Sequence, residues 1–293
     1  MYTPPVDKLY GIIGYPVSHS LSPMLHTTAF QMLNIPAVLL PWAIEPEKLP
    51  AFMESFRLLK IQGCCVTIPH KEAVIPFLDE VSERARAIGA VNLLYLRDGN
   101  VCGDNTDVLG FMEPLRGALT PDAPCRALVL GAGGACRAVV AGLRELGLTD
   151  ITVAYVSKKM PADFSAAFDF KQVPWSDRLD VPADLVINVT PLGMKGQHVN
   201  ETPYPSEMFS GRSGLAYDTV YTPLETRFLR EAVQAGWRTI GGLAMFLGQA
   251  EAQFLTWTGH RLTSEARRKV EDELADCCGN NRGRGPERRP EPF

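Results

Sequence analysis

Segment 126–137, RALVLGAGGACR, joins a short apolar run to a helical pattern through three closely spaced glycines. The apolar run ends at Gly131, and apolar residues recur at helical spacing from 135 to 147. A strand, a glycine turn and a helix in this order are typical of dinucleotide-binding domains. The turn lets the backbone approach a pyrophosphate, and the helix N-terminus holds its negative charge. The segment therefore predicts an α/β fold with a nucleotide site at this turn.

The glycine pattern by itself leaves one alternative open. The last position of the G-x-G-x-x-G pattern is Cys136 here, where glycine or alanine is usual. A tight turn of this kind also occurs in α/β domains that bind no nucleotide. The motif therefore indicates the local fold more firmly than it indicates a ligand.

Length and charge limit the class of protein. The chain has 293 residues, enough for roughly two domains, and its 46% hydrophobic and 21% charged residues are typical of a globular protein. A net charge of −4 argues against a nucleic-acid partner, which needs a basic surface. Neither a signal peptide nor a membrane-spanning run is recognisable. We expect a cytoplasmic protein that binds neither nucleic acid nor a membrane.

Cysteine and histidine spacing favours a reduced protein without a metal. The seven cysteines include two adjacent pairs, Cys64–Cys65 and Cys277–Cys278, and form no C-x-x-C motif. The five histidines are scattered along the chain. These spacings fit neither a disulfide framework nor a zinc site, so we expect no bound metal.

Strand and helix patterns alternate along the chain, as the parallel sheets of α/β proteins require. The expected strands are 9–14, 37–44, 62–68, 90–96, a return strand from Val101, 151–156, 184–189, 215–220 and 237–240. The expected helices are 22–34, 47–60, 74–87, 135–147, 222–235 and 243–257. The tail 277–293 is rich in Gly, Pro and Arg and is expected to be disordered.

Polar residues follow several of the expected strands. They are Ser20, Thr67, Lys71 and Asp107. Ligands of open α/β sheets bind at the carboxyl ends of strands, so we expect these side chains to open onto one crevice. This expectation assumes the order and direction of the strands.

Each candidate also has an ordinary structural interpretation. Ser22 before a proline is typical of a helix N-cap, and Asp107 fits the same role for the helix that follows it. A lysine at the position of Lys71 is usually solvated. Gln249 lies on the flank of an apolar helix face, where it either faces solvent or reaches into a cleft.

Eight motifs occur in an order that resembles shikimate dehydrogenases, and they span the chain to about residue 259. They are GYPVSHSLSP (14–23), VTIPHKE (66–72), GAVN (89–92), GDNTDVLG (103–110), LGAGGACR (130–137), NVTPLGM (188–194), YDTVYTPLET (217–226) and GLAMFLGQA (242–250). The resemblance implies two α/β domains with the active site in the cleft between them. Residues 1–108, completed by C-terminal helices in 243–276, would form the substrate domain, and 109–242 a Rossmann-type domain for NADP.

The resemblance also implies an activity, the reversible reduction of 3-dehydroshikimate to shikimate with NADPH, and a set of site residues. Lys71 and Asp107 match the catalytic pair, and Ser20 and Ser22 match the hydroxyls that hold the substrate carboxylate. The residues that match contacts to the ring hydroxyls are Thr67, Asn92, Tyr221 and Gln249. The residues that match the cofactor site are Gly131, Ala132, Gly133, Gly134 and Ala135 in the pyrophosphate loop, with Thr190 and Gly242 nearby.

The residue types suit this chemistry. Hydride transfer to a ketone carbon makes an alkoxide that needs a proton, and a lysine ammonium supplies one while stabilising the developing charge. We therefore hypothesise that Lys71 is the proton donor and that Asp107 orients it. No metal is needed, because the ammonium polarises the ketone.

One position departs from the family pattern. Family members commonly carry Asn-Arg-Thr, with a further arginine, after the second strand of the nucleotide domain, where they bind the 2′-phosphate of NADP. This chain has Ser157, Lys158 and Lys159 there, and no acidic residue to accept a ribose hydroxyl. A hydroxyl with a lysine can bind a phosphate. We expect NADP, with NAD as the alternative.

Two other functions stay open from the sequence. A quinate dehydrogenase, or a dual quinate/shikimate dehydrogenase using NAD, shares the same motifs. A non-catalytic module that senses a metabolite and a nucleotide is more remote, because it has no need of both Lys71 and Asp107. The sequence does not decide between a monomer and a homodimer.

Overall fold

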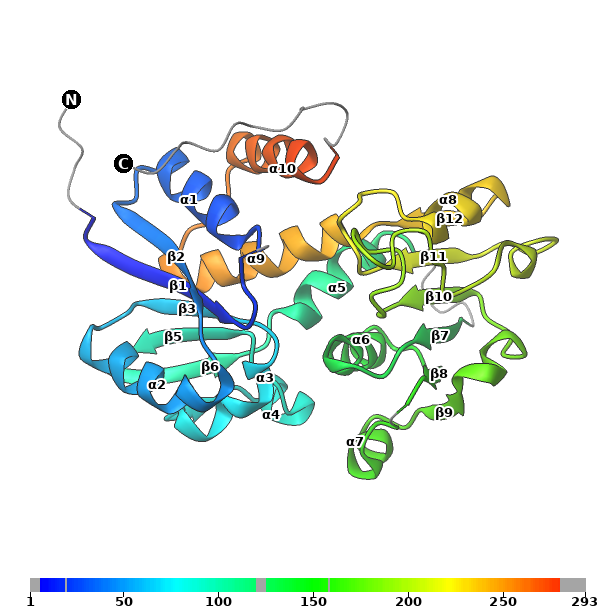
Figure 1. Cartoon of the computed structure of the whole chain (residues 1–293), viewed down its shortest axis with the longest axis horizontal. Helices are drawn as coiled ribbons and strands as arrows, with labels where there is room; N and C mark the ends of the chain where they lie inside the picture. The colour runs from blue at the N-terminus through cyan, green and yellow to red at the C-terminus, as the bar shows by residue number, and fades with distance from the viewer. Residues whose placement is uncertain (1–5, 19, 120–124, 158, 280–293) are drawn as a thin grey trace.

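A computed structural model describes residues 6–18, 20–119, 125–157 and 159–279, with side chains to 276, and the chain folds around two sheets (Figure 1). The first sheet has the strand order β2-β1-β3-β5-β6-β4. Its strands are β1 (Lys8–Gly14), β2 (Ala37–Ala43), β3 (Gly63–Val66), β4 (Glu80–Val81), β5 (Leu93–Arg97) and β6 (Asn100–Asp104). The helices of this part are α1 (Ser22–Met32), η1 (Pro46–Lys48), α2 (Leu49–Leu58), α3 (His70–Ala73), η2 (Ile75–Phe77) and α4 (Glu83–Ile88).

The second sheet has the strand order β12-β11-β10-β7-β8-β9, and every neighbouring pair is parallel. Its strands are β7 (Arg126–Leu130), β8 (Asp150–Tyr155), β9 (Lys171–Pro174), β10 (Leu185–Asn188), β11 (Leu215–Asp218) and β12 (Arg238–Ile240). Its helices are α6 (Gly134–Glu145), α7 (Ala162–Ala167), η3 (Trp175–Leu179), η4 (Ser206–Met208) and α8 (Arg227–Gln234). The expected α/β class with a Rossmann-type second sheet is confirmed.

Strand direction in the first sheet brings the candidate segments to one edge. Strand β3 is parallel to β1, whereas β5 is antiparallel to both β3 and β6. Strands β1, β3 and β6 therefore run the same way, and their carboxyl ends share an edge with the beginning of β5. The segments that follow these strands, and Asn92 just before β5, meet at that edge.

Two helices join the sheets. Helix α5 (Asp107–Arg116) leads from β6 toward β7, and α9 (Gly242–Thr258) returns from the second sheet to the first (Figure 1). The helices cross where Gly110 and Gly248 meet, since a Cβ added to Gly248 would lie 3.0 Å from Gly110 Cα. Trp257 Nε1, at the far end of α9, donates to Leu94 O at 2.9 Å. Helix α10 (Ser264–Gly279) then lies along α1 and accepts a hydrogen bond from Thr28 at Glu273.

Several expected boundaries were wrong, among them the start of the helix expected over 222–235, which begins only at Arg227. Segment 74–87 is not one helix, because Pro76 confines the first turn to a 3₁₀ turn and Glu80–Val81 pairs with β6 instead. The helix starts afresh after Ser82, whose hydroxyl accepts from Ala85 N. Residues 277–279, expected to belong to a disordered tail, are the last residues of α10. Residues 280–293 lie outside the described residues.

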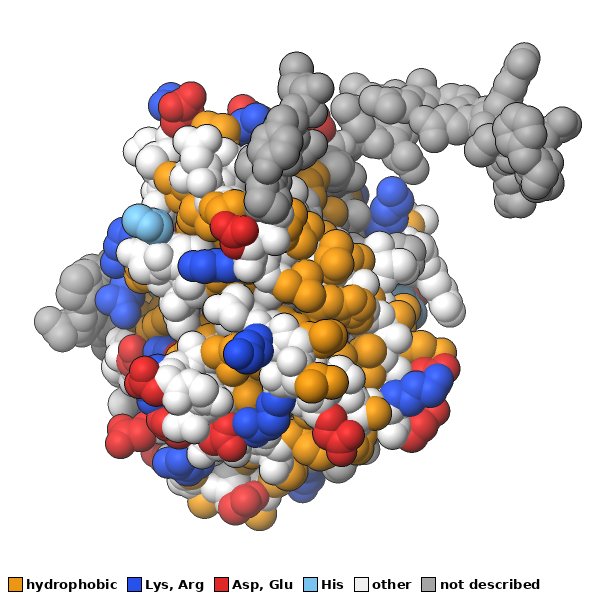
Figure 2. Space-filling model, turned by 90° about the vertical axis from the view of Figure 1, so that its left-hand side faces the viewer, with side chains coloured by type: hydrophobic (Ala, Val, Ile, Leu, Met, Phe, Trp, Pro, Cys, Tyr) orange, Lys and Arg blue, Asp and Glu red, His pale blue; other side chains and the backbone are white. Residues whose placement is uncertain are grey.

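The surface carries charges of both signs. Figure 2 looks onto the side of the first sheet and shows lysine and arginine interspersed with aspartate and glutamate around an apolar area. Within the described ranges, no helix is both long and apolar enough to span a bilayer.

Candidate active site

A cavity of about 370 Å³ lies where the shared edge of the first sheet meets the second sheet and α9. Its first wall comes from the segments after β1, β3 and β6, and its second wall includes Ala135, Thr219 and Gly242. Every catalytic or substrate residue expected from the sequence lines it, namely Ser20, Ser22, Thr67, Lys71, Asn92, Asp107, Tyr221 and Gln249. The expected convergence of strand-end residues is therefore present.

Lys71 and Asp107 form an ion pair in this cavity. Lys71 lies in the short helix after β3, and Asp107 is the first residue of α5. Lys71 Nζ donates to Asp107 Oδ2 at 2.6 Å, and the two side chains are 22% and 14% exposed. The N-cap role that the sequence allows for Asp107 is not observed, because Thr106 takes the N-cap position of α5 and no side chain caps the helix.

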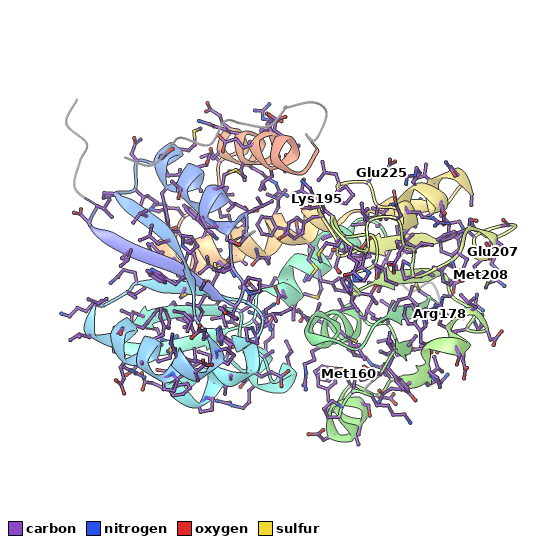
Figure 3. The ribbon with its side chains drawn as sticks, in the orientation of Figure 1. Met160, Arg178, Lys195, Glu207, Met208 and Glu225 are labelled. Carbon is purple, nitrogen blue, oxygen red and sulfur yellow. The ribbon has the colours of Figure 1, made fainter. Side chains whose placement is uncertain are left out.

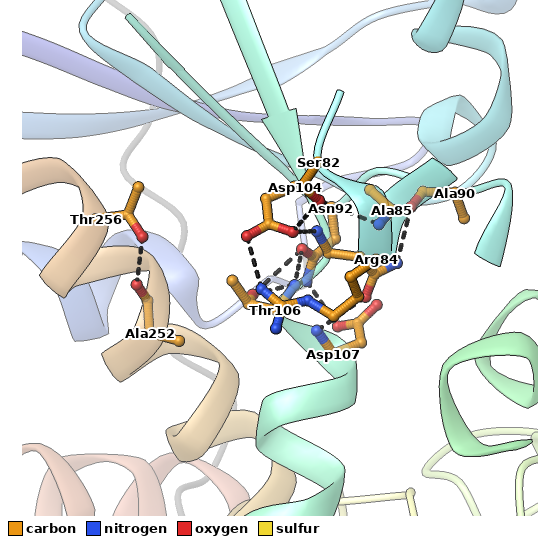
Figure 4. Close-up of polar contacts among 11 residues, drawn as sticks. Ser82, Arg84, Ala85, Ala90, Asn92, Asp104, Thr106, Asp107, Ala252 and Thr256 are labelled. Atoms are coloured by element: carbon orange, nitrogen blue, oxygen red, sulfur yellow. Dashed lines mark hydrogen bonds and ion pairs between the residues drawn. The ribbon is translucent and has the colours of Figure 1, made fainter. Parts of the chain in front are cut away.

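Asn92 fixes the other oxygen of Asp107. Its Nδ2 donates to Asp107 Oδ1 at 2.8 Å and to Thr106 Oγ1 at 3.0 Å (Figure 4). Its Oδ1 accepts from Thr106 N at 2.7 Å and from the Thr106 hydroxyl. These bonds hold the amide between Thr106 and Asp107, so Asn92 orients Asp107 in addition to lining the cavity.

A further set of polar contacts, on Asp104 and Asn105, supports the position of Asp107. Little in the sequence indicates these contacts. Asp104 accepts from Ser82 Oγ at 2.5 Å and from Arg84 at 2.7 Å (Figure 4). It also accepts from Asn105 N at 2.7 Å. Asn105 Oδ1 in turn accepts from Asp107 N at 3.1 Å. Asp104 and Asn105 resemble plain turn residues in the sequence, and the side-chain partners of Asp104 come from the start of α4, about twenty residues earlier.

The two serines lie side by side at one end of the cavity. Ser22 N donates to Ser20 Oγ at 3.2 Å. The expected cap at Ser22 is wrong, because Leu21 takes the N-cap position and no side chain caps α1. The Ser22 hydroxyl instead contacts the thiol of Cys65, which forms part of the cavity wall.

Tyr221 and Gln249 approach from the side of the second sheet. The Tyr221 ring packs on Phe246 with centroids 4.9 Å apart, and Gln249 Nε2 donates to Phe246 O at 2.9 Å. Gln249 is 9% exposed, so it reaches into the cleft, one of the two placements that its position on the helix allowed.

The glycine turn after β7 adjoins the cavity. Gly131 has φ +114°, and a Cβ there would lie 2.9 Å from Thr190 Cγ2. A Cβ at Gly133 or Gly134 would meet no atom within 4 Å, so this backbone faces open space. Helix α6 begins here without a side-chain cap and without an acidic residue in its first turn.

These features fit a dinucleotide, because the exposed backbone and the uncapped helix can hold a pyrophosphate. Ala132 continues the turn, and Ala135 lies in the first turn of α6 and lines the cavity. Gly242 also lines the cavity, and a Cβ there would lie 2.4 Å from Thr219 O. Cys136 is buried in the core of this sheet, where its small side chain suits the close packing of the helix.

The end of β8 is the expected place of the 2′-phosphate. Ser157 is exposed there, Lys158 lies outside the described residues, and Lys159 Nζ lies 5.5 Å from the centre of the Tyr155 ring. Two arginines near the second sheet already donate hydrogen bonds to backbone carbonyl oxygens. Arg137 donates to Ile88 O, and Arg178 (Figure 3) donates to Trp175 O and Pro203 O.

Among the residues with described side chains, no group of three or more His, Cys, Asp or Glu could hold a metal ion. The described cysteines that are free thiols are Cys64, Cys65, Cys102, Cys125 and Cys136.

Comparisons with known proteins agree with this architecture. The family model described as the substrate binding domain of shikimate dehydrogenase matches residues 12–94. Shikimate dehydrogenase (NADP⁺) of Pelobacter propionicus is 58% identical over 267 residues, which are 91% of this chain and 96% of that protein. The corresponding protein of Oleidesulfovibrio alaskensis is 46% identical, over 92% of this chain and 97% of its own length.

A solved structure is similar over nearly the same length. The crystal structure of shikimate 5-dehydrogenase from Thermus thermophilus, in complex with NADP(H) and shikimate, has a TM-score of 0.80 and 36% identity. The likeness covers 91% of this chain and 99% of the other. Because such identity extends over both sheets and the cavity between them, this chain belongs to the shikimate dehydrogenase family.

Proposed function

We propose that the protein reduces 3-dehydroshikimate to shikimate with NADPH, reversibly, in the pathway to chorismate and the aromatic amino acids. The observation that carries this proposal is the Lys71–Asp107 ion pair in a cavity that adjoins the glycine turn of the second sheet. Ketone reduction needs a hydride donor and a proton donor close together. A nucleotide bound at the glycine turn would supply the hydride, and the ammonium group of Lys71 would supply the proton. Relatives named shikimate dehydrogenase (NADP⁺) support the same substrate and cofactor.

In this proposal Lys71 donates the proton. NADPH, when bound, supplies the hydride to the ketone carbon. Lys71 Nζ then protonates the oxygen, and its positive charge stabilises that oxygen as negative charge develops. Asp107 holds the ammonium through the 2.6 Å contact, and Asn92 holds Asp107.

The remaining cavity residues would hold the substrate. Ser20 and Ser22, together at one end, offer hydroxyls to the carboxylate. The residues that line the wall that the ring hydroxyls would face are Thr67, Asn92, Tyr221 and Gln249.

The cofactor would lie along the glycine turn. Gly131, Ala132, Gly133, Gly134 and Ala135 would bind the pyrophosphate, with Thr190 and Gly242 beside it. Ser157 with Lys158 would take the 2′-phosphate. The uncapped start of α6 supports this assignment.

We also infer the domain division and the setting of the protein. Residues 1–108 with 243–276 would form the substrate domain, and 109–242 the NADP domain. The return of α9 to the first sheet, where Trp257 bonds to Leu94, supports this division. We expect a cytoplasmic monomer or homodimer with neither nucleic acid nor membrane as a partner.

One assay tests the proposed reaction. The oxidation of NADPH or NADH is followed by absorbance with 3-dehydroshikimate or 3-dehydroquinate as substrate. We expect the highest kcat/KM for NADPH with 3-dehydroshikimate. A higher kcat/KM with 3-dehydroquinate would identify a quinate dehydrogenase, and a preference for NADH would overturn the cofactor assignment.

A further inference from the structure

An arginine of helix α6 reaches from the second sheet to the part of the chain that surrounds the first. Arg137 lies three residues after Gly134, where α6 begins, and its Nη1 donates to Ile88 O, at the end of α4, at 2.9 Å. Its Nε lies 3.8 Å from Glu72 Oε1, a longer contact to a mostly exposed side chain. The Arg137 side chain is only 16% exposed. The proposed mechanism does not use this residue.

Two neighbours hold the guanidinium group in this position. Its Cζ lies 4.9 Å from the centre of the Phe164 ring, which comes from α7, and an aromatic face attracts a cation. Gly89 follows Ile88 with φ +70°, and a Cβ there would lie 3.3 Å from Arg137 Nη1. The glycine therefore gives the arginine room to reach the carbonyl. A bond from a charged donor is also stronger than one between neutral groups.

The segment at the far end of this bond supports both reactive side chains. Val91 N donates to Lys71 O at 2.8 Å, so the backbone of the lysine is tied to this segment. The side chain of Asn92, the next residue, donates to Asp107. Segment 88–92 is therefore one piece of backbone on which the positions of the ammonium and the carboxylate both depend.

Helix α6 begins at the glycine turn, so Arg137 joins that turn to segment 88–92. Farther along the helix the contact with α5 is apolar, since a Cβ at Gly142 would lie 2.8 Å from Phe111 Cδ1. Apolar contacts are not directional, whereas the hydrogen bond of Arg137 fixes one point of α6 against the other half of the chain. Arg137 does not line the cavity itself.

We propose that Arg137 is a positioning residue, which holds α6 in register with segment 88–92 and so sets the places of Lys71 and Asp107 relative to the nucleotide. This inference rests on the proposed function. A hydride donor bound at one half of the chain and a proton donor on the other must be aligned to react, and a small displacement between them lowers the rate strongly.

Arg137→Met tests the contact, because it keeps an apolar stem and removes the guanidinium group. In the protein without ligands, hydrogen exchange at Val91 N should speed up about tenfold, the size expected for one lost bond from a charged donor. With both ligands saturating, the single-turnover rate constant of NADPH oxidation should fall about 10- to 100-fold. The calorimetric Kd for NADP⁺ should stay at the wild-type value.

Arg144 provides a matched control on the same helix. It donates to Phe168 O and to Leu148 O, which both belong to the second sheet's half of the chain. Its side chain is 19% exposed, close to the value for Arg137. Arg144→Met should lower the melting temperature but leave both the exchange at Val91 and the single-turnover rate constant at their wild-type values.

Arg137→Lys separates the bond from the charge. Lysine keeps the positive charge near the start of α6, but its side chain is one atom shorter and falls short of Ile88 O. We expect slow hydride transfer, as in Arg137→Met, with the wild-type Kd for NADP⁺. An Arg137→Lys variant with the wild-type rate constant would show that the charge alone matters, and the inference would be wrong.

The outcomes separate this inference from the proposed function. A wild-type protein that neither binds nor oxidises shikimate would overturn the proposed function, and this inference with it. If the wild type is active but Arg137→Met lowers only the melting temperature, Arg137 is a packing residue and the inference alone is wrong. The inference is equally wrong if Arg137→Met raises only the Kd for NADP⁺, because Arg137 is then a cofactor-binding residue.

Discussion

Lys71 and Asp107 are held in place by hydrogen bonds with neighbouring side chains. Asp107 presents one oxygen to the ammonium and the other to Asn92. Asn105 fixes the backbone at the start of α5 by accepting from Asp107 N. A lysine that donates a proton must be oriented before the reaction begins, and this set of bonds supplies that orientation.

Replacing Asp107 with asparagine tests the pair. Asparagine replaces one of the two carboxylate oxygens with an NH₂ group, which would face either Lys71 or Asn92, both of them donors, and it lacks the charge that holds the ammonium. We expect kcat for 3-dehydroshikimate to fall about 100-fold, the lower range for a general-acid step. Asp98→Asn, in an exposed turn, is the matched control. An Asp107→Asn variant with the wild-type kcat would refute the orienting role.

At the scale of single elements, the glycine turn and the ends of β10 and β11 form the second wall of the site. Gly131 approaches Thr190 so closely that no side chain fits between them. Asp218, at the end of β11, accepts from Asn188, from Val220 N and from Thr226, which caps α8. These contacts fix the loops that follow the parallel strands, where α/β proteins bind their ligands.

Gly131→Ala should weaken the nucleotide site. Its φ of +114° is strained for alanine, and the new Cβ would lie 2.9 Å from Thr190 Cγ2, so the turn must shift. We expect the Kd for NADP⁺, measured by calorimetry, to rise about tenfold, within the usual cost of backbone strain. Gly117→Ala has a negative φ and open space around it, and should bind as the wild type does. Equal affinities for the two variants would contradict the assigned turn.

Asp218 should make stability depend on pH in a predictable direction. Burial raises its pKa to about 6, although three donors lower it. The folded pKa exceeds the unfolded value of about 3.9, so the folded protein binds the extra proton. This contribution to stability is complete below about pH 4 and is lost as the pH rises through about 6.

Asp218→Asn removes this dependence because it cannot ionise, and its oxygen can still accept from Asn188 and Val220. Denaturant unfolding should show the variant gaining roughly 1–3 kcal/mol over the wild type between about pH 4.5 and 7.5. A difference in the free energy of unfolding that stays constant across this range would show that Asp218 does not titrate there.

At the scale of the whole molecule, the periodicity of apolar residues predicted the fold. The direction of the strands predicted which side chains meet in the site. Alternating patterns predicted both sheets, and the strand-end rule brought Lys71 and Asp107 to one cavity. Local patterns failed where distant partners decide. Glu80–Val81 became a strand because β6 offered it an edge.

The crossing of α5 and α9 holds the two halves together. A Cβ at Gly110 would lie 2.4 Å from Met245 O and 2.6 Å from Gln249 N, which are both backbone atoms. Gly110→Ala should therefore separate the helices and displace Gln249 from the cavity. We expect a loss of about 1–3 kcal/mol in the free energy of unfolding, with a higher KM for shikimate. Gly117→Ala, at the end of the same helix, should change neither value.

The rate of 3-dehydroshikimate reduction by Lys71→Met tests the central claim most directly. If Lys71 donates the proton, kcat for NADPH oxidation should fall about 10²- to 10⁴-fold. The Kd for NADP⁺ and the melting temperature should stay at wild-type values. Lys269→Met, which changes an exposed lysine in the same way, should retain full activity. A Lys71→Met enzyme that keeps most of its kcat would contradict the assignment of Lys71 as the proton donor.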